Sequence, residues 1–216
     1  NTNNRKSIFT NNNKKRPLID LPDTGWTIIR PSSNWEFIFK AGISCPNHLP
    51  GHAHSDLLGF DLFHSGKPII AEVGTSLYGN NPRRYFERSS SAHNVTQLGI
   101  PNTHTKETYT KIKWIEPIDV WNNFRAGRKA KVIHRDYGSN KNKFWVIGSH
   151  DGYKRWGADY ERYVQINRLD KNIKIIFKDK IKCKKIMAWR QFWHLGPEQP
   201  KALLYPLINK VSKKYD

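Results

Sequence analysis

The chain has 216 residues, a length that suits one sizeable domain and is marginal for two. Lys and Arg number 37 against 18 Asp and Glu, a formal net charge of +19, which indicates either a polyanionic partner or simply a composition rich in Lys and Asn. No segment approaches about 18 consecutive apolar residues, so the sequence contains no candidate transmembrane helix.

Residues 1–24 are predicted to be a flexible lead-in and linker, and residues 25–216 a single domain. From residue 25 on, short runs rich in β-branched and aromatic residues alternate with turn residues roughly every ten positions. The predicted strands are 26–30, 35–40, 57–63, 68–73, 111–115, 130–134, 144–149, 160–167, 173–178 and 187–193. Gly66 lies in the turn of a predicted hairpin. No run has a convincing 3.6-residue apolar period, so we expect an all-β fold, an antiparallel β-sandwich.

The densest group of titratable residues comprises His52, His54 and Asp56. We expect this run to be extended, so that the three side chains share one face, roughly 6.5–7 Å apart. Two such histidines are able to bind one metal, or one binds a metal while the other faces a substrate. Asp56 is a candidate for orienting a histidine. A hydrogen-bonded polar patch at the start of a strand is the alternative.

Glu72 and His93 strengthen the hypothesis of a metal site. Glu72 ends an apolar strand, where a carboxylate is costly to bury without a partner. His93 lies among small residues that allow close approach. Together with His54 they form an N,N,O set suited to tetrahedral zinc with one open position.

The segment 82–88 carries a second group of polar side chains, in which Arg84 and Arg88 are candidates for forked contacts with carboxylate or sulfate. Tyr85 is a candidate for hydrogen-bonding a sugar or for moving a proton. The alternative is a solvated loop with one ion pair through Glu87.

The remaining histidines have no clear partner and are expected to be structural or solvated. They are His48, His64, His104, His134, His150 and His194. Cys45 and Cys183 do not make a disulfide framework in a chain of this length, and we expect two buried thiols.

Four runs, taken in order, resemble the C-terminal β-sandwich of the heparinase II/III-like polysaccharide lyases. They are GHAHSDLLGF (51–60), GKPIIAEVGT (66–75), RYFERSSSAHNV (84–95) and HDGY (150–153). The resemblance extends more weakly from about residue 25 to about residue 197. It implies a larger protein in which an α/α toroid precedes the sandwich and the substrate cleft lies between them. It also implies a bacterial protein, periplasmic or secreted, of which this chain is a fragment with a supersandwich-like fold.

The resemblance also implies roles for individual residues. His52 and Tyr85 would be catalytic-site residues, and Arg84 and Arg88 would contact the substrate. His54, Glu72 and His93 would hold a structural zinc, although the family more often has Asp at the position of Glu72.

The chemistry implied by the resemblance is β-elimination on an acidic polysaccharide such as heparan sulfate, alginate or a capsule polymer. In that reaction the C5 proton of a uronic acid is removed and the 4-linked sugar is expelled, while donors neutralise charge on the carboxylate. The family takes further catalytic groups from the toroid, so we expect this chain alone to be inactive. A noncatalytic, zinc-stabilised module that binds acidic glycans is the alternative. Nucleic-acid binding is less favoured, because no helix-turn-helix, RNA-recognition or zinc-finger pattern is present.

Overall fold

The structure of the chain is a computed structural model, and it describes residues 16–101, 111–121, 125–170 and 172–197. The expectations for residues 1–15, for His104 and for the last nineteen residues lie outside this part of the chain. The described residues form three antiparallel sheets, of five, four and three strands.

The five-stranded sheet is built from consecutive strands in the order β1-β2-β3-β4-β5. Its strands are β1 (Leu18–Leu21), β2 (Trp26–Ser32), β3 (Trp35–Lys40), β4 (Phe60–His64) and β5 (Lys67–Ile70). The expectation of a linker up to residue 24 is wrong for β1, because all four of its residues pair with β2. The hairpin between β4 and β5 is confirmed: Ser65 and Gly66 both have positive φ, at 50° and 78°, as a tight turn of this kind requires.

The four-stranded sheet has the order β11-β10-β9-β8. Its long strands are β8 (Val132–Asn140), β9 (Lys143–His150), β10 (Ala158–Arg168) and β11 (Ile173–Cys183). The three-stranded sheet, β12-β6-β7, is formed by β12 (Ala188–Gln191), β6 (Thr96–Pro101) and β7 (Ile112–Trp114). The sequence analysis predicted a strand at each of these positions except β6, which it missed.

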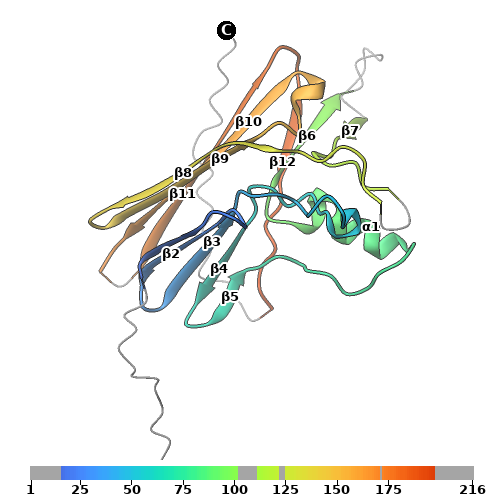
Figure 1. The fold of residues 1–216 in the computed structure, drawn as a ribbon. Coiled ribbons are helices and arrows are strands. Elements are labelled where there is room, and N and C mark those ends of the chain that lie inside the picture. Colours follow the sequence, from blue (N-terminus) through green and yellow to red (C-terminus); the bar gives the residue numbers. More distant parts are fainter. Residues whose placement is uncertain (1–15, 102–110, 122–124, 171, 198–216) are drawn as a thin grey trace, which may run out of the picture.

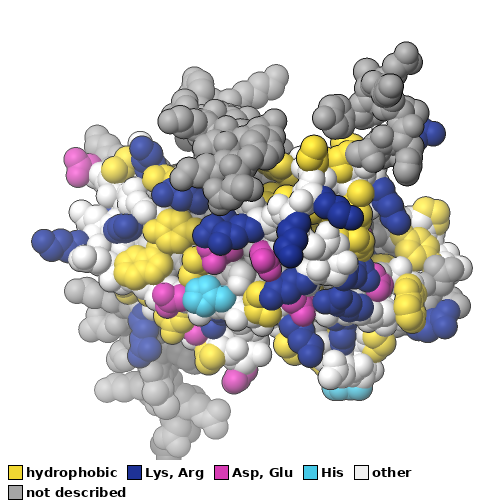
Figure 2. Space-filling model, turned by 90° about the horizontal axis from the view of Figure 1, so that it is seen from above, with side chains coloured by type: hydrophobic (Ala, Val, Ile, Leu, Met, Phe, Trp, Pro, Cys, Tyr) yellow, Lys and Arg dark blue, Asp and Glu magenta, His cyan; other side chains and the backbone are white. Residues whose placement is uncertain are grey.

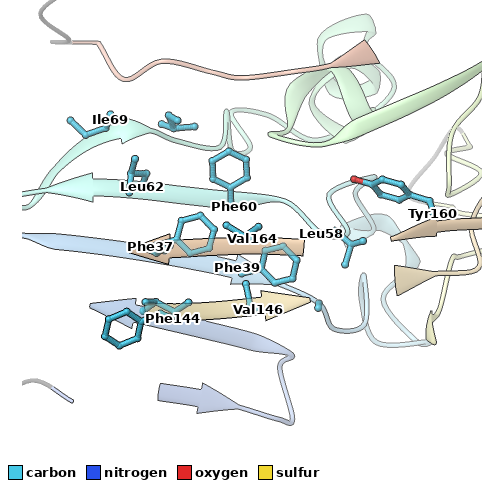
Figure 3. Packing of buried hydrophobic residues seen from close by; sticks show 14 of the residues in the cluster. Phe37, Phe39, Leu58, Phe60, Leu62, Ile69, Phe144, Val146, Tyr160 and Val164 are labelled. Carbon is cyan, nitrogen blue, oxygen red and sulfur yellow. The ribbon is translucent and has the colours of Figure 1, made fainter. Parts of the chain in front are cut away.

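The hydrophobic core lies between the five-stranded and four-stranded sheets, which stack as two layers (Figure 1). Phe37 and Phe39 of β3 meet Phe144 and Val146 of β9 and Val164 of β10 in this layer (Figure 3). Alternate residues of each strand point inward, which is the pattern of a sandwich with solvent on its outer faces. The predicted all-β, antiparallel sandwich class is confirmed.

The helical elements are short and gather at one end of the sandwich or in its loops. They are η1 (Pro50–His52), α1 (Pro82–Arg88), η2 (Ser90–Ala92) and η3 (Lys154–Trp156). A solvated loop was the alternative considered for segment 82–88, and the structure has helix α1 there instead. Cys45 is buried as expected, but Cys183 is exposed at the end of β11.

Candidate functional site

The segment with His52 and His54 is not an extended strand, so these two side chains do not share a strand face. His52 ends the 3-10 helix η1, which Pro50 begins, and is exposed. His54 follows in an irregular segment and is partly buried. Strand β4 starts only at Phe60, after a turn in which Leu58 has a φ of 63°. The hypothesis that one histidine binds a metal while the other faces a substrate stays a prediction.

His54, His93 and Glu72 lie in contact, as the sequence predicted. Nδ1 of His54 is 3.2 Å from Nε2 of His93. On the opposite side of its ring, Nδ1 of His93 makes a very short contact with Oε2 of Glu72. The other carboxylate oxygen of Glu72 accepts a 3.0 Å hydrogen bond from the backbone N–H of Asn94. The carboxylate of Glu72, two residues after the end of β5, is therefore partnered through both of its oxygens.

Arg84 of α1 extends this chain of contacts at its other end. Its NH1 group lies 3.1 Å from Nε2 of His54 and 3.1 Å from the hydroxyl of Thr75, while NH2 donates to the carbonyl of Gly51 at 3.0 Å. Arginine only donates, so Nε2 of His54 is the acceptor in this contact. The proton of neutral His54 is then on Nδ1, facing His93, and the proton of His93 faces Glu72. We call this series of contacts the Arg84–Glu72 chain.

Burial and charge set the protonation of the two histidines in opposite directions. Burial first, and then the charge of neighbouring His93, lower the pKa of His54 to about 4 against the smaller opposing effect of Asp56. Burial also acts to lower the pKa of His93, but its hydrogen bond and charge interaction with Glu72 outweigh burial and raise it. Any extra proton on the pair is thus held on His93, next to the carboxylate.

Asp56, expected to orient a histidine, forms an ion pair with Lys40 of β3 instead. Its charge still acts on the pKa of His54, which it raises.

Helix α1 forms because Asn81 caps it, accepting a 2.8 Å hydrogen bond from the backbone N–H of Arg83, and because Pro82 suits the first helical position. Its buried face consists of Arg84, Glu87 and Arg88. The spacing is helical, but the buried side chains are charged, so a search for apolar periodicity could not find the helix.

Arg88 uses its guanidinium to hold backbone segments together. It is 3% exposed and donates to four carbonyls, those of Pro50, Ala53, Trp121 and Arg125, at 2.9–3.3 Å. Arg84 is 4% exposed and holds Gly51 in the same way. Both arginines thus fix the segment that carries His52 and His54. Direct substrate contact by Arg84 or Arg88 stays a prediction.

Tyr78 is a site residue that the sequence analysis missed. It is 55% exposed, and its ring lies 5.9 Å from the ring of His52 and 5.1 Å from the guanidinium carbon of Arg84. Its loop is anchored by Ser76, whose backbone N–H donates to Glu87 at 3.1 Å and whose hydroxyl donates to the same carboxylate oxygen. These hydrogen bonds, the hydroxyl's first, lower the pKa of Glu87. The only sequence signal was an aromatic residue in a polar loop.

Tyr85 is on α1 near the same loop. Its hydroxyl donates a 2.5 Å hydrogen bond to the side-chain oxygen of Asn80. Tyr85 is partly buried, whereas the neighbouring Phe86 is exposed. The structure thus brings His52, Tyr78 and Tyr85 to the elements around the Arg84–Glu72 chain, and the catalytic roles of His52 and Tyr85 stay predictions.

A buried ion pair supports this site from the core. Arg162 of β10 binds Asp179 of β11 through two 2.8 Å contacts. Its remaining NH1 donors reach the carbonyls of Leu58 and Asn94, each at 2.9 Å. Asn94 adjoins His93, so this pair fixes the backbone that carries the second histidine.

The two histidines have the spacing of zinc ligands, while Glu72 does not face the same point. Two nitrogens on a tetrahedral zinc, each about 2.0–2.1 Å from the metal, lie roughly 3.3 Å apart, close to the 3.2 Å between His54 and His93. Glu72 contacts the far nitrogen of His93, the position of a carboxylate that orients a ligand. Within the described residues, no three His, Cys, Asp or Glu side chains are arranged to hold an ion. The two imidazole nitrogens suit zinc, and a complete site would require His54 to carry its proton on Nε2 and Glu72 to rotate toward the metal.

Of the other histidines, His150 is the most informative. It is buried between Tyr153 and Tyr160 and accepts a 3.1 Å hydrogen bond from the backbone N–H of Gly152. Burial lowers its pKa to about 4. His64 packs against Trp35 with ring centroids 4.5 Å apart. A structural role for both agrees with the expectation.

The fold and the site together define an antiparallel β-sandwich domain with a partly buried histidine–carboxylate chain at one end. The family model described as heparinase II/III-like, C-terminal, matches residues 13–214. The chain belongs to this family, as its sequence motifs indicated, and it is thereby related to polysaccharide lyases. No curated protein matches the chain.

Solved structures share the fold. One structure of heparinase III, the BT4657 gene product with methylated lysines, has a TM-score of 0.50 and 15% identity over 78% of this chain and 22% of its own. Another of the same gene product has a TM-score of 0.50 and 14% identity over the same shares. The heparan sulfate lyase HepC from Pedobacter heparinus has a TM-score of 0.46 and 17% identity, over 70% of this chain and 20% of its own. The chain thus spans only 20–22% of the length of these structures.

No helix in the described residues is long and apolar enough to cross a membrane.

Proposed function

We propose that this chain is the sandwich domain of a polysaccharide lyase that cleaves uronic-acid-containing acidic glycans by β-elimination. The observation that carries the proposal is the exposed His52 beside the partly buried Arg84–Glu72 chain, in a protein of the heparinase II/III-like family.

The reaction removes a weakly acidic C5 proton and expels the sugar linked at C4. Imidazole exchanges protons readily near neutral pH, so exposed His52 is suited to receive or return one. The hydroxyl of Tyr85 is a second group for proton transfer. Tyr78 presents an exposed ring beside His52, where a sugar ring has room to pack.

The two buried arginines serve this reaction by positioning. Arg88 holds the carbonyls of Pro50 and Ala53 on either side of His52, and Arg84 holds that of Gly51. A catalytic group must be kept in its productive geometry, and these bonds restrict the movement of His52.

A structural zinc belongs to the proposal. His54 and His93 would bind it through the nitrogens that face each other, and Glu72 would orient His93 or, after rotation of its side chain, become the third ligand. Bound zinc would fix the two rings and add to the stability of the fold.

The family takes further catalytic groups from a toroid, so the chain alone is expected to be inactive. The decisive experiment therefore uses the full-length protein that contains this sequence. It is incubated with heparan sulfate, alginate and a neutral glucan, and ultraviolet absorbance of the unsaturated uronate product is followed. Activity on an acidic glycan that His52→Ala abolishes in a folded protein supports the proposal.

Full activity of His52→Ala would overturn the role of His52. No unsaturated product from any acidic glycan, with binding retained, would favour the noncatalytic, zinc-stabilised glycan-binding module. The net charge of +19 is the observation that favours this second function.

A further inference from the structure

The outer face of the four-stranded sheet has a composition that the histidine site does not explain. Phe144, Val146, Val164 and Ile166 point from β9 and β10 into the core. Successive side chains alternate between the two faces of a strand. The outer face therefore carries Trp145 and Ile147 from β9, and Tyr163, Gln165 and Asn167 from β10, all partly buried.

Trp145 lies flat against this sheet. It pairs with Gly138 of β8, and a Cβ atom placed on Gly138 would lie 2.2 Å from Cζ2 and 2.7 Å from Cε2 of the indole. Only glycine leaves this room on the neighbouring strand. The indole thus packs over the backbone of β8, and because Trp145 is only partly buried, the rest of the ring leaves apolar surface on this face, which we call the platform.

A ladder of polar side chains runs beside the platform along β10. The hydroxyl of Tyr163 donates to Oε1 of Gln165 at 3.1 Å, and Nε2 of Gln165 donates to Oδ1 of Asn167 at 2.9 Å. Gln165 is the register partner of Trp145. The hydrogen bonds hold these groups in fixed orientations next to the indole, where hydroxyl-rich ligands would meet them.

Lysines line the edge of the same face. Lys174, Lys178, Lys180 and Lys182 alternate along the outer face of β11, and all four are exposed. Glu161 and Asp159 are the register partners of Lys180 and Lys182, whereas Tyr163 and Asn167 are those of Lys178 and Lys174. The positive charge is therefore least compensated beside the polar ladder. Figure 2, which looks down on the molecule from above, shows Lys and Arg side chains among exposed hydrophobic ones.

We infer that this face binds a strand of acidic polysaccharide, at a site separate from the histidine site. A sugar ring would pack on Trp145, and its carboxylate or sulfate groups would meet Lys174 and Lys178. Strands β9 and β11 are two strand spacings apart, roughly 10 Å, so a glycan lying across the strands would reach both. The face points away from the core and from the five-stranded sheet, and this binding does not require lyase activity.

The test measures binding of a heparin oligosaccharide to the chain by titration calorimetry, at low and physiological salt. Trp145→Ala is expected to weaken binding about tenfold, and Lys174→Gln with Lys178→Gln about as much, with a smaller dependence on salt. The matched control is Lys113→Gln, an exposed lysine of β7 in the three-stranded sheet, which should leave the affinity within about twofold. Because Trp145→Ala removes a partly buried ring, its far-ultraviolet circular dichroism must match that of the parent, and the lysine pair tests the site independently.

The inference is overturned if the parent chain does not bind heparin, or if the Trp145 and lysine variants bind it as the parent does. Equal weakening by Lys113→Gln would also overturn it, since net charge alone would then attract the polyanion. Equally tight binding of a DNA duplex, insensitive to Trp145→Ala, would have the same meaning. If heparin does not bind this face but the full-length protein is an active lyase, only this inference fails and the proposed function is unaffected. If His52→Ala loses lyase activity but still binds heparin, the inference is unaffected, because the binding site is then separate from the histidine site.

Discussion

The guanidinium of Arg84 lies 3.1 Å from Nε2 of His54 and fixes which nitrogen of that histidine carries the proton. Because arginine cannot accept a hydrogen bond, His54 must accept at Nε2 and donate from Nδ1 toward His93. The same reasoning places the proton of His93 on Nδ1, facing Glu72. A metal between the two histidines would need both facing nitrogens free of protons, so Arg84 and a metal favour different tautomers of His54.

The first prediction concerns these tautomers. In chelator-treated protein at mildly alkaline pH, both His54 and His93 are expected as neutral Nδ1–H tautomers. Long-range proton–nitrogen correlation spectra of isotope-labelled protein would report the tautomer directly. Arg84→Met removes the fixed donor, so the His54 signal should shift toward the Nε2–H form. An Nε2–H tautomer of His54 in the unsubstituted, metal-free protein would contradict the Arg84–Glu72 chain.

The second prediction concerns zinc. Purified protein is expected to contain about one zinc per chain by elemental analysis, and His54→Ala and His93→Ala should each lose it. If Glu72 orients His93 from behind, Glu72→Gln should weaken zinc binding only about 10- to 100-fold. His134→Ala, on the exposed part of β8, is the matched control. If the purified protein is folded, contains no metal and does not bind added zinc, the zinc prediction is wrong.

The third prediction concerns Arg88, whose four acceptors are backbone carbonyls. Arg88→Met keeps the apolar stem but leaves those carbonyls without their donor, so the free energy of unfolding should fall by about 3 kcal/mol. Arg83→Met on the exposed side of the same helix should change it by less than about 0.5 kcal/mol. Urea unfolding of both variants would measure the free energy of unfolding. If Arg88→Met and Arg83→Met lower it equally, the hydrogen bonds of Arg88 do not stabilise this end of the fold.

The fourth prediction is a pH dependence that arises from His150. Burial lowers the pKa of folded His150 from 6.5 to about 4, so the unfolded chain binds more protons between these two values. The contribution to stability is complete above pH about 6.5 and is lost as the pH falls toward about 4, by up to about 3 kcal/mol. His150→Gln should reduce the slope of the stability profile in this window and leave a remainder, because the pKa of His54 is also lowered to about 4.

Urea titrations at several pH values would measure this profile, with His134→Gln as the control that retains the slope. If the free energy of unfolding of His150→Gln depends on pH as steeply as that of the parent, the pH dependence arises from other groups.

The segment 50–56 shows where sequence reasoning failed. Alternation of His52, His54 and Asp56 favoured a strand, but Pro50 begins a 3-10 helix, and Arg84 and Arg88 hold the segment through its carbonyls. Those arginines come from more than thirty positions further along the chain, so local pattern could not reveal them. Helix α1 was missed for a related reason, since the face that it buries is charged.

The sequence by itself determined most of the strands, though not β1 or β6, as well as the sandwich class and the grouping of His54, Glu72 and His93. Strand alternation and turn residues are local signals, and the family motifs are contiguous. Only the tertiary structure decided that Arg84 contacts His54 and that Arg88 donates hydrogen bonds to backbone carbonyls. It also decided that the ring of Tyr78 lies beside His52. Each of these contacts joins segments that are distant in sequence, and a charged side chain enters the interior only where folding brings enough partners to replace its lost water.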